Sequence, residues 1–214
     1  MKRLKLTPGK RALVVVAHPD DETIWMGGTI LMNRGVRWTI FCLTRSSDKD
    51  RAPKFIKACK IYRARGIITD LDDENRLSYT KSVIAIKRLM TIKLRDEKFE
   101  YLFTHGDNGE YGHKRHLGVN EAVLNWRPKD KLKVKKIFCF NYKKAGKGRK
   151  PSMVAKKDSD YYFMLSEKAF LKKKNIQAVV HGYDWDGVDV GYCTNPEAFK
   201  IAYPVSHIAY RSNK

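Results

Sequence analysis

The 214-residue sequence lacks the patterns that would place it in a membrane or in a disulfide-bonded secreted fold. No apolar run approaches the roughly 20 residues that a membrane-spanning helix needs. The basic N-terminus, MKRLKLTPGKR, is not followed by the apolar segment of a signal peptide. The four cysteines are scattered and form no CxxC pair. We therefore expect no transmembrane segment, free thiols and a cytoplasmic location.

Acidic residues are also scarce, because 23 Asp and Glu stand against 44 Lys and Arg and give a formal net charge of +21. Such an excess favours acidic partners, such as phosphorylated metabolites, nucleic acid or an anionic membrane face. A lysine-rich surface that is simply solvated explains the same charge. The charge alone therefore does not identify a partner.

What the sequence does contain is an alternation of strand-like and helix-like segments. Residues 12–17 form a short, continuous apolar run, which is typical of a strand covered on both faces. This alternation predicts crossover connections and a parallel sheet. We expect an α/β fold, with residues 1–214 forming a single Rossmann-like three-layer domain and a mostly parallel sheet. Further strands are expected at 38–43, 101–104 and 134–140, and helices at 22–34, 54–65, 82–97, 114–124 and 165–176.

Glycine predicts the end of one helix, and a run of basic residues predicts an exposed loop. Gly66 is expected to end the second helix, since glycine adopts the left-handed conformation at helix C-termini. Residues 143–157 carry seven basic residues, glycines and a proline but no acid, and are expected to form an exposed loop.

Three consecutive acids follow the first strand in the segment VVVAHPDDET, residues 14–23. Ligands of open parallel sheets bind beyond the carboxyl ends of the strands, so His18, Asp20 and Asp21 are expected at that rim. His18 and Asp21 are three residues apart, and a tight turn brings their side chains to one side. Imidazole and carboxylate are good zinc ligands, and a catalytic zinc site uses three protein ligands plus water. Helix capping explains one of these acids, but it does not explain the histidine.

A second polar cluster lies in THGDNGEYGHKRHLGVNEAV, residues 104–123, again directly after an expected strand. Its His113 and His116 are three residues apart at the start of a helix, so either can complete a three-ligand site with His18 and Asp21. The remaining acids and histidines are then free for proton transfer. A set of two histidines and one aspartate with open positions also matches the facial triad that holds non-haem iron.

The motif AHPDDE after a hydrophobic strand, followed by GEYGHxxH, resembles the PIG-L/LmbE-like family of zinc-dependent N-deacetylases. The resemblance extends more loosely over residues 12–180. It implies a Rossmann-like fold, a Zn²⁺ cofactor with Fe²⁺ as the alternative, and removal of an acetyl group from an N-acetylglucosamine-containing compound. Family substrates include glycosyl inositols, thiol-precursor glycosides and chitin fragments.

The resemblance also implies a role for each residue of the first motif. By position, Asp20 would be the general base that activates water at the metal. The metal ligands that the resemblance implies are His18, Asp21 and His116.

The second motif supplies the remaining roles. His113 would stabilise the oxyanion or protonate the leaving amine, and Tyr111 would help to hold the transition state. Arg51 matches an arginine that contacts the substrate sugar or its phosphate. The family commonly has Pro-Asp between its two histidines, whereas this chain has Lys114 and Arg115. Losing that aspartate and gaining two cations is expected to lower the pKa of His113.

The expected substrate is an N-acetylated amino sugar or glycoside, an anionic one included. The alternatives are an amidase that acts on a larger amide conjugate of an amino sugar, and a nucleic-acid-binding protein with a degenerate site. The basic segment 143–157 lacks the interleaved aromatics of an RNA-binding surface, so no obligate nucleic-acid partner is expected. A homo-oligomer is compatible with the sequence, which does not determine the oligomeric state.

Other polar residues near these motifs are expected to have structural roles. His105 and Glu110 should order the loop that contains them. The acids of YDWDGVD, residues 183–189, miss the spacing of an EF-hand calcium loop. Tyr183 and Trp185 in the same segment could stack on a sugar ring, but we expect them to pack within the protein.

Overall fold

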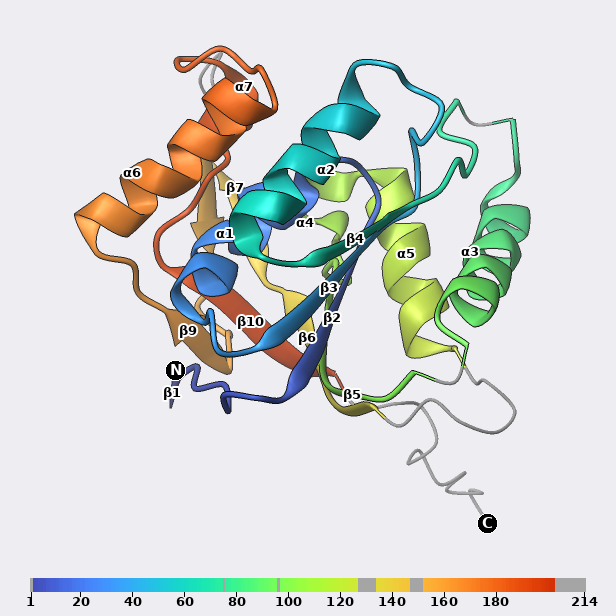
Figure 1. Ribbon diagram of the computed structural model, residues 1–214, viewed down its shortest axis with the longest axis horizontal. Coiled ribbons are helices and arrows are strands. Elements are labelled where there is room, and N and C mark those ends of the chain that lie inside the picture. The colour runs from blue at the N-terminus through green and yellow to red at the C-terminus, as the bar shows by residue number, and fades with distance from the viewer. Residues whose placement is uncertain (1, 75, 96, 127–133, 147–151, 203–214) are drawn as a thin grey trace.

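The computed structural model describes residues 2–74, 76–95, 97–126, 134–146 and 152–202, and it shows a sheet with helices on both faces (Figure 1). The eight strands of this sheet follow the order β1-β9-β10-β6-β5-β2-β3-β4. Strands β2 to β6 are parallel, whereas β10 is antiparallel to both of its neighbours. The expected α/β fold with a mostly parallel sheet is therefore confirmed. The strands of the sheet are β1 (Lys2–Arg3), β2 (Arg11–Val16), β3 (Arg37–Cys42), β4 (Arg65–Ile68), β5 (Phe99–Thr104), β6 (Val134–Phe140), β9 (Tyr161–Phe163) and β10 (Glu197–Ala202).

Strand β2 lies between β5 and β3 because its side chains are apolar on both faces. Val14 and Val16 belong to one hydrophobic core, and Leu13 and Val15 belong to the other. Helices α1, α2 and α6 pack on the first face, and α3 and α5 pack on the second (Figure 1). The helices are α1 (Asp21–Met32), α2 (Arg51–Tyr62), α3 (Tyr79–Lys93), α4 (Gly109–Gly112), α5 (Lys114–Leu124), α6 (Glu167–Asn175), the π-helix η1 (Ile176–Val180) and α7 (Val188–Gly191).

The structure corrects both of the boundary predictions. Helix α2 ends at Arg63, which takes the left-handed conformation with φ of 55°, and not at Gly66. Gly66 lies within β4, where an added Cβ would come within 2.9 Å of the sulfur of Cys59, so the close approach of α2 requires glycine there. The expected loop at 143–157 is instead part of a hairpin, formed by β7 (Tyr142–Ala145) and β8 (Ser152–Ala155). Residues 147–151 of that prediction lie outside the described residues.

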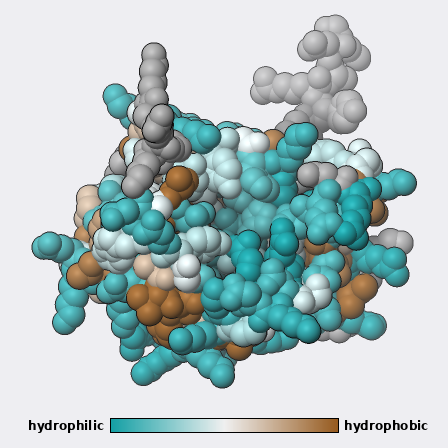
Figure 2. Space-filling view, turned by 90° about the horizontal axis from the view of Figure 1, so that it is seen from above, coloured by the Kyte–Doolittle hydropathy of each residue, from teal (hydrophilic) through white to brown (hydrophobic). Residues whose placement is uncertain are grey.

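The loops that follow the parallel strands lie at the top of Figure 1, and Figure 2 looks down on that side. This face is mostly hydrophilic, with hydrophobic residues gathered at its lower left (Figure 2). Among the described residues, no helix has both the length and the apolar character needed to cross a bilayer.

Candidate active site and metal centre

The three predicted metal ligands meet beyond the carboxyl end of β2. His18 follows this strand after one residue, Asp21 begins α1, and His116 lies in the first turn of α5. Because β2 and β5 are adjacent and parallel, the segments that follow them open onto the same rim of the sheet. The topology thus brings together residues that are 98 positions apart in the chain.

The spacing of the ligand atoms fits a tetrahedral metal ion. His18 Nδ1 lies 3.2 Å from Asp21 Oδ2 and 3.3 Å from His116 Nε2, and His116 Nε2 lies 3.4 Å from Asp21 Oδ1. Zinc–nitrogen and zinc–oxygen bonds of about 2.0–2.1 Å place tetrahedral ligand atoms about 3.3–3.4 Å apart. The donor set therefore suits zinc, and the distances between the three residues are close to this spacing, with Asp21 facing His18 through Oδ2 and His116 through Oδ1.

Two further histidines lie close enough to compete as ligands. His105 groups with Asp21 and His116, and His113 groups with His18 and His116, with all ligand atoms within 4.8 Å of one another. Both nitrogens of His105 are already engaged, because Nε2 accepts the backbone N–H of Ala17 at 3.0 Å and Nδ1 contacts Glu110 at 2.9 Å. His18 and His116 are engaged at both nitrogens in the same way, so the expected structural role of the buried His105 stays a prediction.

Carboxylates behind the site fix the orientation of both ligand histidines. Glu110 Oε2 lies 2.6 Å from His116 Nδ1, which leaves Nε2 of that ring facing His18 and Asp21. Asp73 Oδ1 lies 3.0 Å from His18 Nε2, which leaves Nδ1 of that ring facing it. Such partners set the tautomer of a ligand histidine and raise its basicity. Glu110 thus does more than order its loop.

The charges of this cluster are strongly coupled to one another. Burial disfavours the charged ring of His18, but its hydrogen bonds to Asp21 and Asp73 outweigh burial and raise its pKa to about 9. Burial raises the pKa of Glu110, yet His105 and His116 outweigh this effect and lower it to about 2. The carboxylates are therefore ionised at neutral pH, and a metal ion must displace a proton from His18.

Asp20 is held by residues from two other elements. Its Oδ2 accepts hydrogen bonds from the Tyr183 hydroxyl at 2.5 Å and from the Arg51 guanidinium at 3.0 Å. The Arg51 guanidinium also donates to the Pro19 carbonyl and to the Tyr183 hydroxyl. Oδ1 of Asp20 makes no hydrogen bond within the described part of the chain. Arg51 therefore borders the cavity, as expected, but its direct partner is Asp20.

Asp20 also has unusual backbone and electrostatic properties. Its φ of 143° is rarely adopted by a residue other than glycine, and such conformations cluster at functional sites. Burial, together with the charge of Asp21, raises the pKa of Asp20 to about 6, against the opposing effects of Arg51 and Tyr183.

His113 and Tyr111 line the same cavity as the metal ligands. His113 Nδ1 accepts the backbone N–H of Arg115 at the start of α5, so in the neutral ring Nε2 carries the proton. Burial and the neighbouring His116 lower the pKa of His113 to about 4. The direction agrees with the expectation from the sequence, but the cause differs. Lys114 is exposed, and the Arg115 guanidinium lies 3.6 Å from Asp72.

Several residues of the cavity were not expected from the sequence. Asp73 follows β4, a strand that was not predicted from the sequence. The position of Asp73 at the same rim of the sheet could therefore not be predicted either. Tyr183, Asp189 and Tyr192 come from the segment that includes α7 and also line the cavity. Tyr183 was expected only to pack, and its contact with Asp20 shows that this prediction was wrong.

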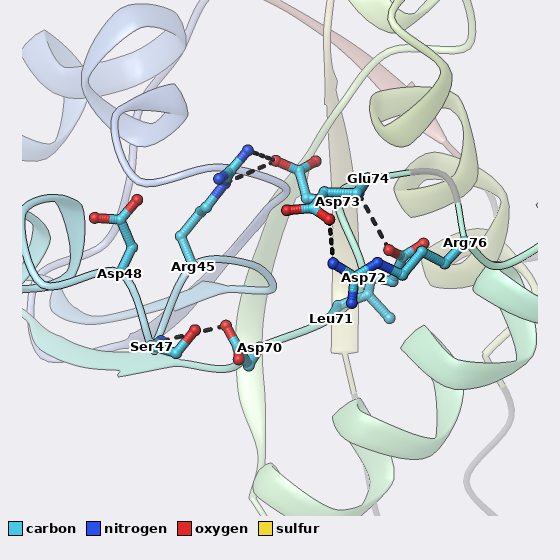
Figure 3. A pocket seen from close by; sticks show the side chains of 9 residues that line it. All are labelled: Arg45, Ser47, Asp48, Asp70, Leu71, Asp72, Asp73, Glu74 and Arg76. Atoms are coloured by element: carbon cyan, nitrogen blue, oxygen red, sulfur yellow. Dashed lines mark hydrogen bonds and ion pairs between the residues drawn. The ribbon is translucent and has the colours of Figure 1, made fainter.

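A second cavity of about 410 Å³ adjoins the first and shares Asp73 with it. Figure 3 shows Arg45 pointing to the Asp73 carboxylate, and the two groups are 2.8 Å apart. Five of the nine lining residues are acidic, although the chain as a whole is strongly basic. The lining residues are Arg45, Ser47, Asp48, Asp70, Leu71, Asp72, Asp73, Glu74 and Arg76.

Comparison with known protein families and curated sequences gives consistent matches. The family model described as GlcNAc-PI de-N-acetylase, PIG-L, matches residues 13–127, which is more than half of the chain. An uncharacterised protein of Acanthamoeba polyphaga mimivirus is 24% identical over 185 residues, covering 79% of this chain and 76% of the relative. The 1D-myo-inositol 2-acetamido-2-deoxy-alpha-D-glucopyranoside deacetylase of Rhodococcus erythropolis is 25% identical over 146 residues. That match covers 50% of this chain and only 49% of the relative.

Solved structures with the same fold have different activities. The N,N'-diacetylchitobiose deacetylase from Pyrococcus horikoshii aligns with a TM-score of 0.65 and 18% identity, over 95% of this chain and 88% of that one. The 4-carboxy-2-hydroxymuconate hydratase from Pseudomonas putida aligns with a TM-score of 0.61 and 14% identity, over 91% and 97% of the two chains. At these identities the likeness establishes the fold alone, and the reaction must be argued from the site.

Proposed function

Because the chain belongs to the GlcNAc-PI de-N-acetylase (PIG-L) family, we propose that it is a zinc-dependent hydrolase. It would remove the N-acetyl group from an N-acetylglucosamine-containing substrate. The observation that carries this proposal is the convergence of His18, Asp21 and His116, whose nearest nitrogen and oxygen atoms lie 3.2–3.4 Å apart, beside a carboxylate with a free oxygen. Relatives named as deacetylases of acetamido sugars support the substrate class.

Zinc would be held by His18, Asp21 and His116. When bound, it would supply a Lewis acid for the amide carbonyl and lower the pKa of a water from about 15.7 towards about 7. Asp73 and Glu110 would keep the two ligand histidines in the tautomers that zinc requires. Ferrous iron fits the same donor set and is the alternative metal.

Asp20 would be the general base. Arg51 and Tyr183 occupy its Oδ2, so Oδ1 is the atom available to take a proton from the attacking water. A pKa of about 6 is closer to neutral than that of an ordinary aspartate, which suits a group that gains and then returns a proton. The same carboxyl group could then deliver this proton to the leaving amine.

His113 and Tyr111 would stabilise the oxyanion. The neutral His113 ring offers its Nε2–H to the cavity, and the Tyr111 hydroxyl is a second donor on the same wall. Oriented donors of this kind stabilise the charge that develops on the carbonyl oxygen in amide hydrolysis. In this scheme His113 acts as a hydrogen-bond donor and not as the acid. Contact of Arg51 with the substrate sugar or its phosphate stays a prediction.

The test is amine release from N-acetylglucosamine, N,N'-diacetylchitobiose and an N-acetylglucosaminyl inositol. Each is assayed with zinc, with ferrous iron, with a chelator and with the Asp20→Asn variant. Release that requires metal and is lost in the variant is the expected result. No release from any substrate by metal-loaded protein would contradict the deacetylase. Longer N-acyl analogues in the same assay would then test the amidase alternative, and binding to RNA would test the nucleic-acid alternative.

A further inference from the structure

The reaction cavity contains four carboxylates, and the described residues provide side-chain partners for three of them. Asp20 is bound by Arg51 and Tyr183, as described above. Asp21 and Asp73 contact His18 and other side chains of the metal site. Asp189, the fourth carboxylate, forms no ion pair and accepts no hydrogen bond from any other described side chain.

Asp189 comes from a different part of the chain than the metal ligands do. It lies in α7, and Tyr183 and Tyr192 on either side of it in sequence also line the cavity. The residues before it in this segment are mostly exposed, whereas Asp189 is half-buried. It therefore belongs to the wall of the cavity and not to the outer surface of the segment.

A half-buried carboxylate whose hydrogen-bond partner is its own backbone N–H carries a cost, because it loses water and is only partly compensated. Burial accordingly raises the pKa of Asp189. A ligand that enters the cavity displaces the remaining water from the Asp189 carboxylate. Unless the ligand donates a hydrogen bond to this carboxylate, its desolvation becomes more unfavourable. An anionic group at this position would also be repelled by Asp189 and by Asp21.

The size of the cavity limits what this donor can be. Its volume is about 240 Å³, below the roughly 300–1,000 Å³ of pockets that enclose drug-sized ligands. It can take one sugar ring with its acetamido group, while further units would lie outside it. The groups of that ring that can donate a hydrogen bond, other than the reacting amide, are its hydroxyls.

We propose that Asp189 is a specificity-determining residue, which accepts a hydrogen bond from a hydroxyl of the ring that carries the acetamido group. This inference rests on the proposed function for the identity of the ring. It also limits the expectation that the net charge of +21 favours an anionic substrate. The ring in the cavity is uncharged near Asp189, and any anionic group of the substrate lies on a unit outside the cavity.

The test measures binding and does not depend on turnover. The ligands are methyl β-glucosaminide, which has already lost the acetyl group, and its 3-deoxy, 4-deoxy and 6-deoxy analogues. Their dissociation constants for zinc-loaded protein are measured by ligand-detected NMR. In the unaltered protein, one deoxy analogue should bind about tenfold or more weakly than the parent, as expected for a lost bond to a charged acceptor.

In Asp189→Ala this difference should fall to within twofold, because the acceptor is gone. Asp189→Asn keeps the shape and a neutral carbonyl acceptor, and it should give an intermediate difference. Asp186→Ala is the matched control, since Asp186 is exposed, lies three residues earlier and does not line the cavity. It should keep the full difference. Circular dichroism and zinc content must match those of the unaltered protein in all variants.

The inference is overturned if the parent glycoside does not bind, or if Asp189→Ala leaves every difference between ligands unchanged. Acetate release from methyl N-acetyl-β-glucosaminide is followed separately with the unaltered protein. Hydroxyl-dependent binding without acetate release would support the role of Asp189 and contradict the hydrolase. Acetate release with unchanged differences in Asp189→Ala would support the hydrolase and overturn the role of Asp189.

Discussion

Two groups of charged residues contact α1, and they differ in whether all their polar atoms have hydrogen-bond partners within the protein. Beneath the middle of the helix, Glu197 and Lys173 are fully buried and 2.7 Å apart. Glu197 also accepts the N–H groups of Gly28 and Thr29 and the Thr29 hydroxyl at 2.6–2.8 Å. It thereby caps the second part of a helix that is interrupted at Met26. This group is saturated by the protein itself.

At the N-terminus of the same helix, a second polar group lines a cavity and is not saturated. Asp20, Asp21 and His116 are buried there, and His18 is partly exposed. Ligand atoms of His18, Asp21 and His116 face one another at 3.2–3.4 Å. Oδ1 of Asp20 has no partner among the residues that the structure describes. Buried polar groups are normally satisfied because an unmade bond is costly. The difference fits a structural role for the first group and the proposed binding of a metal and a substrate by the second.

The largest effect that would test this difference is expected in Asp20→Asn. The variant keeps the shape of the side chain but removes the base, so acetate release should fall about 10²–10⁴-fold. Zinc content and the melting temperature should stay within error of the unaltered protein, because the partners of Oδ2 remain. Initial rates, metal analysis and thermal unfolding provide the measurement, with Asp186→Asn as an exposed control. A rate within threefold of the unaltered protein would show that Asp20 is not the base.

The opposite pattern is expected at the saturated group. Glu197→Leu leaves the buried Lys173 without an acidic partner, with only the Thr194 carbonyl as an acceptor among the described residues, and removes the acceptor of two helix N–H groups. Breaking a buried pair in this way should lower the free energy of unfolding by about 3–5 kcal/mol. Urea unfolding followed by circular dichroism measures this loss. The fraction that stays folded should keep its rate of acetate release.

A second variant separates the lost pair from the lost cap. Glu197→Leu combined with Lys173→Met removes both charges, so part of the stability should return while the two N–H groups remain without Glu197. If Glu197→Leu instead kept its stability but abolished activity, the assignment of this group to structure alone would be wrong.

The sequence reveals the unsaturated group far better than the saturated one. The spacing of His18 and Asp21, and of His113 and His116, is local and follows an expected strand, so these residues could be named in advance. Lys173 and Glu197 are 24 residues apart in unrelated elements, and no short pattern connects them. Their pairing follows from tertiary packing, which a single sequence does not show.

Because a single sequence does not show tertiary packing, some residues of the site itself were not predicted. Helix α5 and strand β6 were predicted at their observed bounds, because their apolar patterns are strong. Strand β4 has only four residues and no fully buried one, so it was missed, and Asp73 beyond it was missed as well. Tyr183 could not be matched to Asp20, since 163 residues separate them. The supporting residues Asp73 and Tyr183 were therefore harder to predict than the candidate metal ligands and base that they contact. The prediction of a single domain stays a prediction.

Glu110→Gln tests one of these supporting residues, and its effect should be smaller than that of Asp20→Asn. The substitution weakens the hydrogen bond that keeps Nε2 of His116 free for the metal. Loss of such a partner typically lowers metal affinity 10–100-fold. Competition with a zinc-binding dye gives the dissociation constant, and the exposed Asp107→Asn serves as control. Saturating zinc should restore most of the activity, whereas unchanged affinity would show that His116 does not need Glu110.

The smallest effect is expected in Tyr183→Phe, which removes one of the two donors to Oδ2 of Asp20. The Tyr183 hydroxyl favours the charged form of this carboxylate, so its loss should raise the pKa of Asp20 further. Asp20 acts as a base only when it is deprotonated, and the acidic limb of the pH–rate profile should therefore move to higher pH. The rate on the plateau above that limb should fall by less than about tenfold, because Arg51 still orients the carboxylate. Profiles of kcat/KM against pH for the variant and the unaltered protein measure the shift. If the acidic limb moves to lower pH or does not move, the titration of Asp20 does not determine it. Base catalysis would then not explain why Oδ1 of Asp20 has no partner among the described residues.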